Sequence, residues 1–152
     1  MRGAPLLVLV LFTGAAQAAP LVLNEIEINP EGVDSGAEWV EILNVSDDPV
    51  DLAGWTVSYA YRGPGTLPIV DDSTILAPGE RFVFVYPRLS LRNAEPDAIQ
   101  LIDPAGLVVD EALSLTDTED DGRTWQRFPD GGDPLFLDLW LFLPATREAT
   151  ND

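Results

Sequence analysis

The stretch EWVEILNVSDDPVDLAGW, from Glu38 to Trp55, decides the fold class of this sequence. Its first part alternates, so that Val40 and Ile42 fall on one face of an extended chain, and this period of two predicts a half-buried β-strand. The opposite face takes Trp39, Glu41 and Leu43. Turn-forming residues follow at positions 44–49, before a second extended run leads to Trp55. The stretch therefore predicts two strands joined by a turn.

Similar segments occur before and after this stretch. In LVLNEIEIN, residues 21–29, one face is predicted to carry Val22, Ile26 and Ile28, and the other Leu23, Glu25 and Glu27. The run RFVFVY, residues 81–86, is apolar on both faces, which is typical of a buried strand. We therefore predict that the first segment is a half-buried strand and the second a central strand of the core.

A β-hairpin is predicted from AIQLID at residues 98–103 and LVVDEAL at residues 107–113. The two runs are separated by Pro104, Ala105 and Gly106, which favour a turn. In this hairpin Ile99 and Leu101 are expected to point inward and to face Leu107 and Val109.

The segment LFLDLWLFL, from Leu135 to Leu143, has a single polar residue, Asp138. A short apolar run can be a buried strand or part of a helix. Pro134 and Pro144 bound this run at strand length, so a strand is favoured. Thirteen prolines and twelve glycines are spread along the whole chain and leave no room for a long helix. The expected fold is an all-β sandwich of about seven to nine strands.

The first eighteen residues have the layout of a secretory signal peptide. Arg2 supplies the positive charge, an apolar run covers Leu6 to Phe12, and Ala16 and Ala18 suit signal peptidase. The apolar run is shorter than the roughly 20 residues that an uncleaved membrane anchor needs. We therefore predict cleavage before Ala19, one domain over residues 19–152, and a secreted protein of extracellular, cell-surface or periplasmic location.

The chain is strongly acidic. Every basic residue is an arginine, and loss of Arg2 with the signal leaves seven arginines against 26 acidic residues, a net charge of −19. Such a charge repels phosphate backbones and anionic membrane surfaces. We therefore expect no nucleic-acid partner and no membrane insertion after cleavage. An acidic surface without lysine fits both a GC-rich genome and a salty habitat.

Cysteine and histidine are both absent. Without disulfides, stability has to come from the core or from bound ions. Without histidine the chain lacks the commonest general base and the commonest metal-binding nitrogen, and neither histidine nor lysine is present to activate a serine nucleophile. These absences favour a protein that is not an enzyme and has no cofactor, with calcium as the open alternative.

Several short motifs follow one another in order along the chain. They are Asn24-Glu25-Ile26, Asn29-Pro30, Glu38 to Asn44, Val50 to Trp55, Leu76 to Glu80, Leu101 to Glu111 and Arg123 to Gly131. This order resembles the lamin-tail domain family, including its members in secreted bacterial and archaeal proteins. The resemblance spans essentially the whole chain after the signal and lies in the order of the motifs.

The resemblance implies an immunoglobulin-like β-sandwich with Leu52 and Trp55 in or near the core. It also implies that Glu38 and Glu41 make backbone or cross-strand contacts. The family commonly closes with Thr-Pro-Gly-x-x-Asn, whereas residues 146–151 here read TREATN, so the closing turn departs from the pattern. Members often accompany nucleases or other catalytic domains, but nothing in this sequence supplies such an activity.

Four acids on predicted strands are candidates for paired carboxylates: Glu25, Glu27, Glu38 and Glu41. Glycoside hydrolysis uses two acids that flank a cleft. Acids that alternate along strands are also typical of a solvent-facing sheet surface, and this interpretation is favoured. A small carboxylate-based hydrolase stays as a remote alternative.

The loop DTEDDG, residues 117–122, matches the opening of a calcium loop, with acids at its first, third and fifth positions and glycine at the sixth. The twelfth position, which carries a bidentate acid in an EF-hand, is Phe128, so a full EF-hand is excluded. Asp117, Glu119 and Asp121 are therefore candidate ligands of a looser calcium site. The alternative is an acidic, solvated loop.

Asn44 begins an N-glycosylation sequon, Asn-Val-Ser, within a predicted turn of an exported chain. It is therefore a candidate glycosylation site. The alternative is that the asparagine shapes the turn.

Two sets of side chains are candidates for a partner-binding surface. Tyr59 and Tyr61 are two residues apart and share a strand face, although aromatic residues of a small sandwich more often belong to the core. The second set consists of Leu135, Leu137, Leu139 and Leu141. At a sheet edge, this strand would accept a partner strand or form a homodimer; otherwise it is the last core strand.

Together these observations predict a secreted, non-enzymatic module that mediates protein or surface interaction, including glycan binding, at or outside the cell envelope. The alternative is a calcium-stabilised structural component of a surface layer or matrix.

Overall fold

The computed structural model describes residues 19–59, 67–68, 74–85, 91–132 and 139–151. All regular elements within these ranges are β-strands, eleven in number, which confirms the predicted all-β class. The number exceeds the prediction because three strands are only two residues long, namely β3 (Val50–Asp51), β5 (Leu67–Pro68) and β6 (Ile75–Leu76). No helix in the described part of the chain has the length and apolar character needed to cross a membrane.

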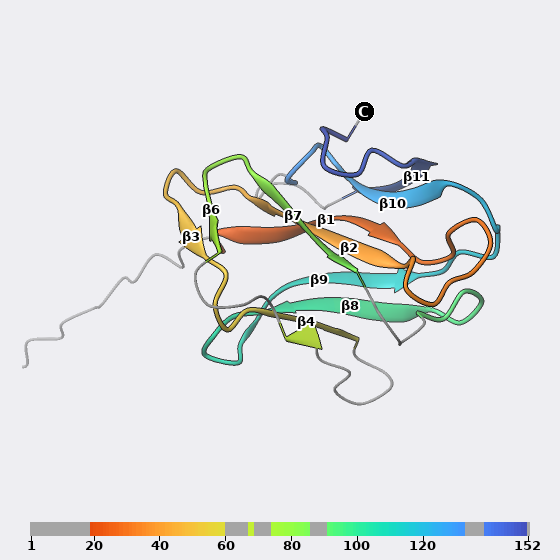
Figure 1. The fold of residues 1–152 in the computed structure, drawn as a ribbon, viewed down its shortest axis with the longest axis horizontal. Helices are drawn as coiled ribbons and strands as arrows, with labels where there is room; N and C mark the ends of the chain where they lie inside the picture. The colour runs from red at the N-terminus through yellow and green to blue at the C-terminus, as the bar shows by residue number, and fades with distance from the viewer. Residues whose placement is uncertain (1–18, 60–66, 69–73, 86–90, 133–138, 152) are drawn as a thin grey trace, which may run out of the picture.

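The strands form two main layers (Figure 1). The larger sheet has five antiparallel strands in the order β11 (Leu139–Pro144), β10 (Arg123–Phe128), β1 (Leu21–Glu27), β2 (Trp39–Asn44) and β7 (Arg81–Val85). The smaller sheet has the order β5, β4 (Thr56–Tyr59), β8 (Asp97–Ile102) and β9 (Val108–Leu115). A short ladder joins β3 to β6. The predicted sandwich is therefore confirmed.

The hydrophobic core lies between the two layers. Its fully buried members include Leu23 and Ile42 from the larger sheet and Val57 and Leu101 from the smaller one. Burial of a side chain of this size contributes roughly 1.5–3 kcal/mol relative to exposure. Leu52 and Trp55, which follow the turn at residues 44–49 (the opening turn), also belong to this core, as the family resemblance implied.

A β-bulge changes the face that β1 presents to the core. The register with β2 shifts between Leu23 and Glu25, and Leu21, Leu23 and Ile26 are all buried in the core. The predicted grouping of Leu23 with Glu25 and Glu27 is therefore wrong. An extra residue in one strand moves every later side chain to the other face, and simple alternation does not reveal it.

The prediction of a central strand at residues 81–86 is also wrong. β7 pairs with β2 and forms an edge of the larger sheet, whose inner strands are β10, β1 and β2. Phe84 is buried in the core, but Val85 is 41% exposed. An apolar run indicates that both faces of a strand are buried. It carries no information about whether another strand pairs with each edge.

The predicted hairpin is confirmed, since β8 pairs with β9 in antiparallel fashion. Ile99 and Leu101 are buried, and Val109 packs partly buried against the core. Leu107 does not face them, because it lies in the turn, where its N–H donates to Asp103 Oδ1 at 2.8 Å, and it is 63% exposed. A register shift near Ile102 then places Asp110 opposite Leu101.

The last apolar run contains a strand, β11, over residues 139–144. Leu135, Leu137 and the predicted signal peptide lie outside the described residues.

Candidate functional site

The outer face of the larger sheet carries a buried polar layer. Its acids Glu25 and Glu41 are 0% exposed, and two further acids, Glu38 just before β2 and Glu27 at the end of β1, are also buried at 0% and 3% exposed. The prediction that these acids face solvent is therefore wrong. For Glu25 and Glu41 the reason is the chain after β11, residues 145–151, which returns over this face and donates to both carboxylates. We call residues 145–151 the closing segment.

Glu25 lies at the centre of the layer. Its Oε1 accepts hydrogen bonds from Thr124 Oγ1 at 2.5 Å and from the Thr146 N–H at 2.8 Å. Its Oε2 accepts from Thr146 Oγ1 at 3.0 Å. Buried polar groups in proteins are normally satisfied in this way, so the contacts tie the closing segment to β1 and β10.

Glu41 makes a similar set of contacts on β2. It accepts from Asn24 Nδ2 at 2.9 Å and from the Glu148 N–H at 2.6 Å, and its Oε1 lies 3.4 Å from Arg81 Nε. Burial raises the pKa of Glu41, and the contacts with Asn24, Glu148 and Arg81 act in the opposite direction. Arg81 also pairs with Asp130, which links the edge strand β7 to the turn after β10.

The closing segment ends on Asn151, which is 5% exposed. Its Nδ2 donates to the carbonyl oxygens of Asn24 and Arg127, both at 3.0 Å, and its Oδ1 accepts from Thr146 Oγ1 at 3.0 Å. Glu148 adopts a φ of 62°, at the position where the family signature has glycine. The segment is therefore anchored by its threonine and asparagine even without the Pro-Gly pair.

The buried acids Glu38 and Glu41 serve structural contacts. Glu38 Oε2 accepts from the Leu91 N–H at 2.8 Å, and Glu41 accepts from the Glu148 N–H. The backbone role that the resemblance implied for both acids is therefore confirmed. With its carboxylates held by these donors, the layer shows no arrangement in its described residues that supports acid–base hydrolysis.

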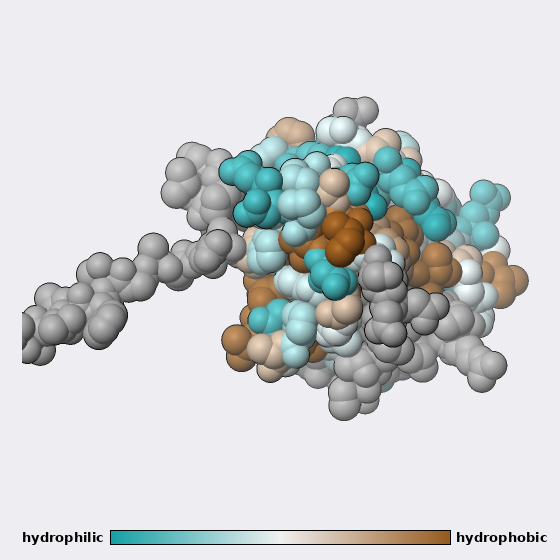
Figure 2. Space-filling view, turned by 60° about the vertical axis from the view of Figure 1, so that its left-hand side comes forward, coloured by the Kyte–Doolittle hydropathy of each residue, from teal (hydrophilic) through white to brown (hydrophobic). Residues whose placement is uncertain are grey.

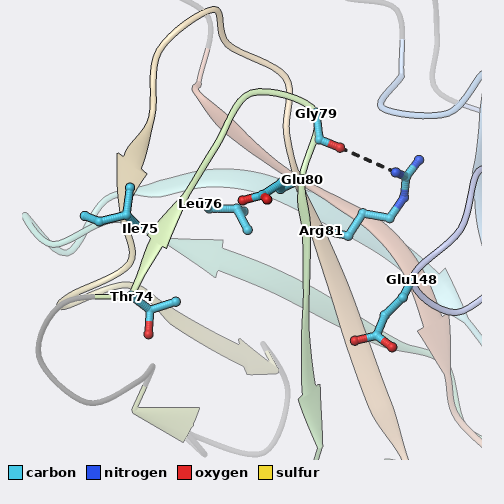
Figure 3. A pocket seen from close by; sticks show the side chains of 7 residues that line it. All are labelled: Thr74, Ile75, Leu76, Gly79, Glu80, Arg81 and Glu148. Carbon is cyan, nitrogen blue, oxygen red and sulfur yellow. Dashed lines mark hydrogen bonds between the residues drawn. The ribbon is translucent and has the colours of Figure 1, made fainter.

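A shallow open hollow of about 450 Å³ lies beside the layer (Figure 3). Its lining comes from β6 and the residue before it, the turn that leads into β7, the first residue of β7 and the closing segment: Thr74, Ile75, Leu76, Gly79, Glu80, Arg81 and Glu148. Arg81 is the basic residue of this lining, and it is already paired with Glu41 and Asp130. The hollow thus offers little charge of its own to recognise an anion.

A second polar cluster lies where β1 ends, beside the acidic loop at residues 117–122. We call this region the acidic end of the sandwich. Burial, together with the negative charges of Asp117 and Asp121, raises the pKa of Glu27 to about 7. Burial also raises the pKa of Asp117, and the charge of Asp121 adds to this effect. Asp121 behaves differently, because its hydrogen bond with Arg123 lowers its pKa.

The three predicted calcium ligands are only partly brought together. Asp117 is 3% exposed, and its Oδ1 accepts from the Glu119 N–H at 2.9 Å. Asp121 pairs with Arg123 at 2.8 Å, and the Glu119 side chain is exposed. Within the described ranges no three acidic side chains already form a group that could hold a metal ion. The calcium site therefore stays a prediction, and Glu27 is the neighbour that sequence reasoning missed.

β11 forms the other edge of the larger sheet, beyond β10. On its outer face Leu139 is 56% exposed and Leu141 is 37% exposed, beside Phe128 at 43%. On its inner face the Arg127 guanidinium lies 5.2 Å from the Trp140 ring, and that of Arg123 lies 4.5 Å from the Phe142 ring. These contacts hold one face of the strand while the outer leucines stay accessible.

Two other predicted site residues are buried. Tyr59 is 5% exposed and belongs to the core, so its placement on an exposed patch is wrong, and Tyr61 lies outside the described residues. Asn44 is 1% exposed, and its Nδ2 donates to the carbonyl oxygens of Asp48 and Leu76, both at 2.9 Å. A glycan on this nitrogen is incompatible with the folded structure, because the nitrogen holds the turn together.

Comparison with known proteins identifies the family. The profile of the family described as Lamin Tail Domain matches residues 14–116, more than half of the chain. The chain belongs to the lamin tail domain family. Lamin tail domains are immunoglobulin-like and non-enzymatic, in agreement with the sandwich described above. Neither a curated protein nor a solved structure matches the chain. In this lamin tail domain, β10, β11 and the closing segment lie beyond the matched range.

The partners of the buried acids were not predictable from local sequence. Thr124, Gln126 and Thr146 contact Glu25 across sequence separations of 99, 101 and 121 residues. The available signal was the order of the family motifs, since residues 123–131 contain Thr124 and Gln126 and the closing residues 146–151 contain Thr146.

Proposed function

We propose that this lamin tail domain is an exported, non-enzymatic interaction module that binds an extended segment of a partner polypeptide along β11. The observation that carries the proposal is an edge strand with exposed leucines at Leu139 and Leu141. Export rests on the N-terminal sequence pattern and places the partner at or outside the cell envelope.

Strand addition fits the chemistry of this edge. An added strand would pair with the free backbone groups of β11, and its alternate side chains would lie beside Leu139 and Leu141 on the outer face. The other edge of the larger sheet is less suitable, because β7 begins with Arg81, and charged residues on an edge oppose strand addition.

The charge of the protein favours a partner that is not a second copy. Two chains of charge −19 repel each other, whereas a neutral segment is not repelled and a basic segment is attracted. β11 itself, LWLFLP, carries no charge, so the selectivity comes from the surrounding acidic surface. A homodimer through β11 would form only where salt screens this repulsion.

The test uses the immobilised chain to capture partners from the secreted and envelope fractions of the source cells. Leu139→Lys with Leu141→Lys is expected to abolish capture of a defined partner, because lysine on an edge strand opposes pairing. Ile75→Lys is the matched control, since Ile75 is 55% exposed on the short ladder strand β6.

Exposed apolar residues also gather on another face, where hydrophilic residues surround them (Figure 2). A partner captured through those residues would not depend on β11. Capture that survives the double substitution, or that Ile75→Lys removes equally, would refute binding at β11. Identification of the mature N-terminus by mass spectrometry tests export separately, with a start at Ala19 expected.

A further inference from the structure

Three segments far apart in the sequence meet at the acidic end of the sandwich. Pro30 forms an isolated parallel bridge with Asp121, and the Gly32 N–H donates to Asp120 Oδ1 at 2.6 Å. The Asp117 N–H donates to the Asn93 carbonyl oxygen at 2.8 Å. These contacts bring the connection between β9 and β10 against the loop that follows β1.

One carboxylate oxygen at this junction is buried without a hydrogen-bond partner in the described part of the chain. Asp117 is 3% exposed, and its Oδ2 is buried without a hydrogen-bond partner among the described residues. Glu27, also 3% exposed, accepts from the Asn29 N–H at 3.2 Å. Asn29 Oδ1 in turn accepts from Asn93 Nδ2 at 2.6 Å, so Asn93 links the end of β1 to Asp117. Arg123 pairs with Asp121 and so does not neutralise Asp117 or Glu27 by a direct contact. Burial of a carboxylate without a compensating partner is costly.

We propose that this junction binds one calcium ion, with Asp117 and Glu27 as its anchoring carboxylates. Calcium takes six to eight oxygen ligands in flexible geometry and accepts backbone carbonyls and water beside carboxylates, so the two acids need to supply only part of its shell. Magnesium requires near-ideal octahedral geometry and gives up its water reluctantly. An ion at Asp117 Oδ2 would supply the positive charge that this buried oxygen lacks.

The assignment differs from the ligand set expected from the loop sequence alone. Glu27 comes from β1, whereas the Glu119 side chain is exposed and its N–H donates to Asp117 Oδ1. The site is separate from β11, so its failure would leave the proposed function untouched.

The experiment is thermal unfolding of the chain after EDTA treatment, with calcium or magnesium added back at pH 7.5. A ligand that binds only the folded state raises Tm by mass action, and calcium at a hundredfold excess over Kd is expected to raise it by about 5 °C or more. Magnesium at the same concentration is expected to have little effect.

Variants locate the ion. Asp117→Asn and, separately, Glu27→Gln are expected to remove the calcium-dependent rise in Tm. Asp47→Asn is the matched control, because it removes one acid from the exposed turn at the opposite end of the strands and should keep the full rise. If Asp117→Asn does not fold, Glu27→Gln alone decides. Equal shifts with both metals, no shift with either, or a calcium shift that persists in Glu27→Gln would overturn the site.

Discussion

Substitution of Glu27 by glutamine should remove a defined part of the pH dependence of stability. Glu27 is buried at the end of β1, and its pKa is raised to about 7 mainly by burial. In the unfolded chain the same carboxyl titrates near 4.5. Between these two values the folded protein holds a proton that the unfolded chain has lost.

The sign and size of the effect follow from this difference. Because the folded pKa is the higher one, the stabilising contribution is complete below pH 4.5 and is lost as the pH rises toward 7. The slope is about −1.4 kcal/mol for each pH unit, which amounts to roughly 3 kcal/mol over the whole window. Glutamine keeps a neutral side chain of the same shape at every pH, so the variant should lack this loss.

The assay is urea unfolding of both proteins in EDTA at pH 5, 6, 7 and 8. The free energy of unfolding of Glu27→Gln relative to the parent chain should rise steadily across the series, to a gain of roughly 2–3 kcal/mol at pH 8. Asp117 and Glu41 also have raised pKa values, so both proteins keep some decline with pH. Parallel curves for the two proteins would refute a proton on folded Glu27.

Three further substitutions test the polar layer and the opening turn. Glu148→Gly should raise the free energy of unfolding by about 1 kcal/mol, because it removes a side chain at a φ of 62°; a loss in urea unfolding would show that Glu148 is not strained. Asn151→Ala should cost roughly 2–4 kcal/mol, since it leaves the buried carbonyls of Asn24 and Arg127 unpaired, and an unchanged midpoint in the same assay would contradict the anchoring role of the closing segment. Asn44→Ala should lower Tm by several degrees through loss of one buried and one partly buried hydrogen bond, whereas mass spectrometry of the parent chain should show no glycan at this position.

Local sequence patterns predicted correctly those features of the fold that depend on residues close together in the chain. The hairpin of β8 and β9 follows from two apolar runs and a Pro-Ala-Gly turn, and its inward residues Ile99 and Leu101 are buried. The same patterns failed for β7, because neighbours along a strand edge depend on the order of strands in the sheet. They also failed for β1, because a single extra residue at the bulge reverses the faces that follow.

The candidate sites could likewise be predicted only in part from the sequence. The acidic loop at 117–122 and the apolar run that contains β11 are visible in the sequence, but their neighbours are not. Glu27 acts on Asp117 only because the chain between β9 and β10 crosses from one sheet to the other past the end of β1. Leu139 is exposed on the outer face of β11, and β11 is an edge because no further strand follows it in the sheet.

The sequence by itself determined the all-β class, the family and the core positions of Leu52 and Trp55, because periodicity, turn residues and motif order are properties of the chain read in one direction. The tertiary structure alone decided that Glu25 and Glu41 are buried and that β11 is an edge. The closing segment reaches Glu25 across 121 residues. A contact at that distance depends on how whole sheets pack, since the burial of a polar strand face requires a cover that another part of the chain supplies.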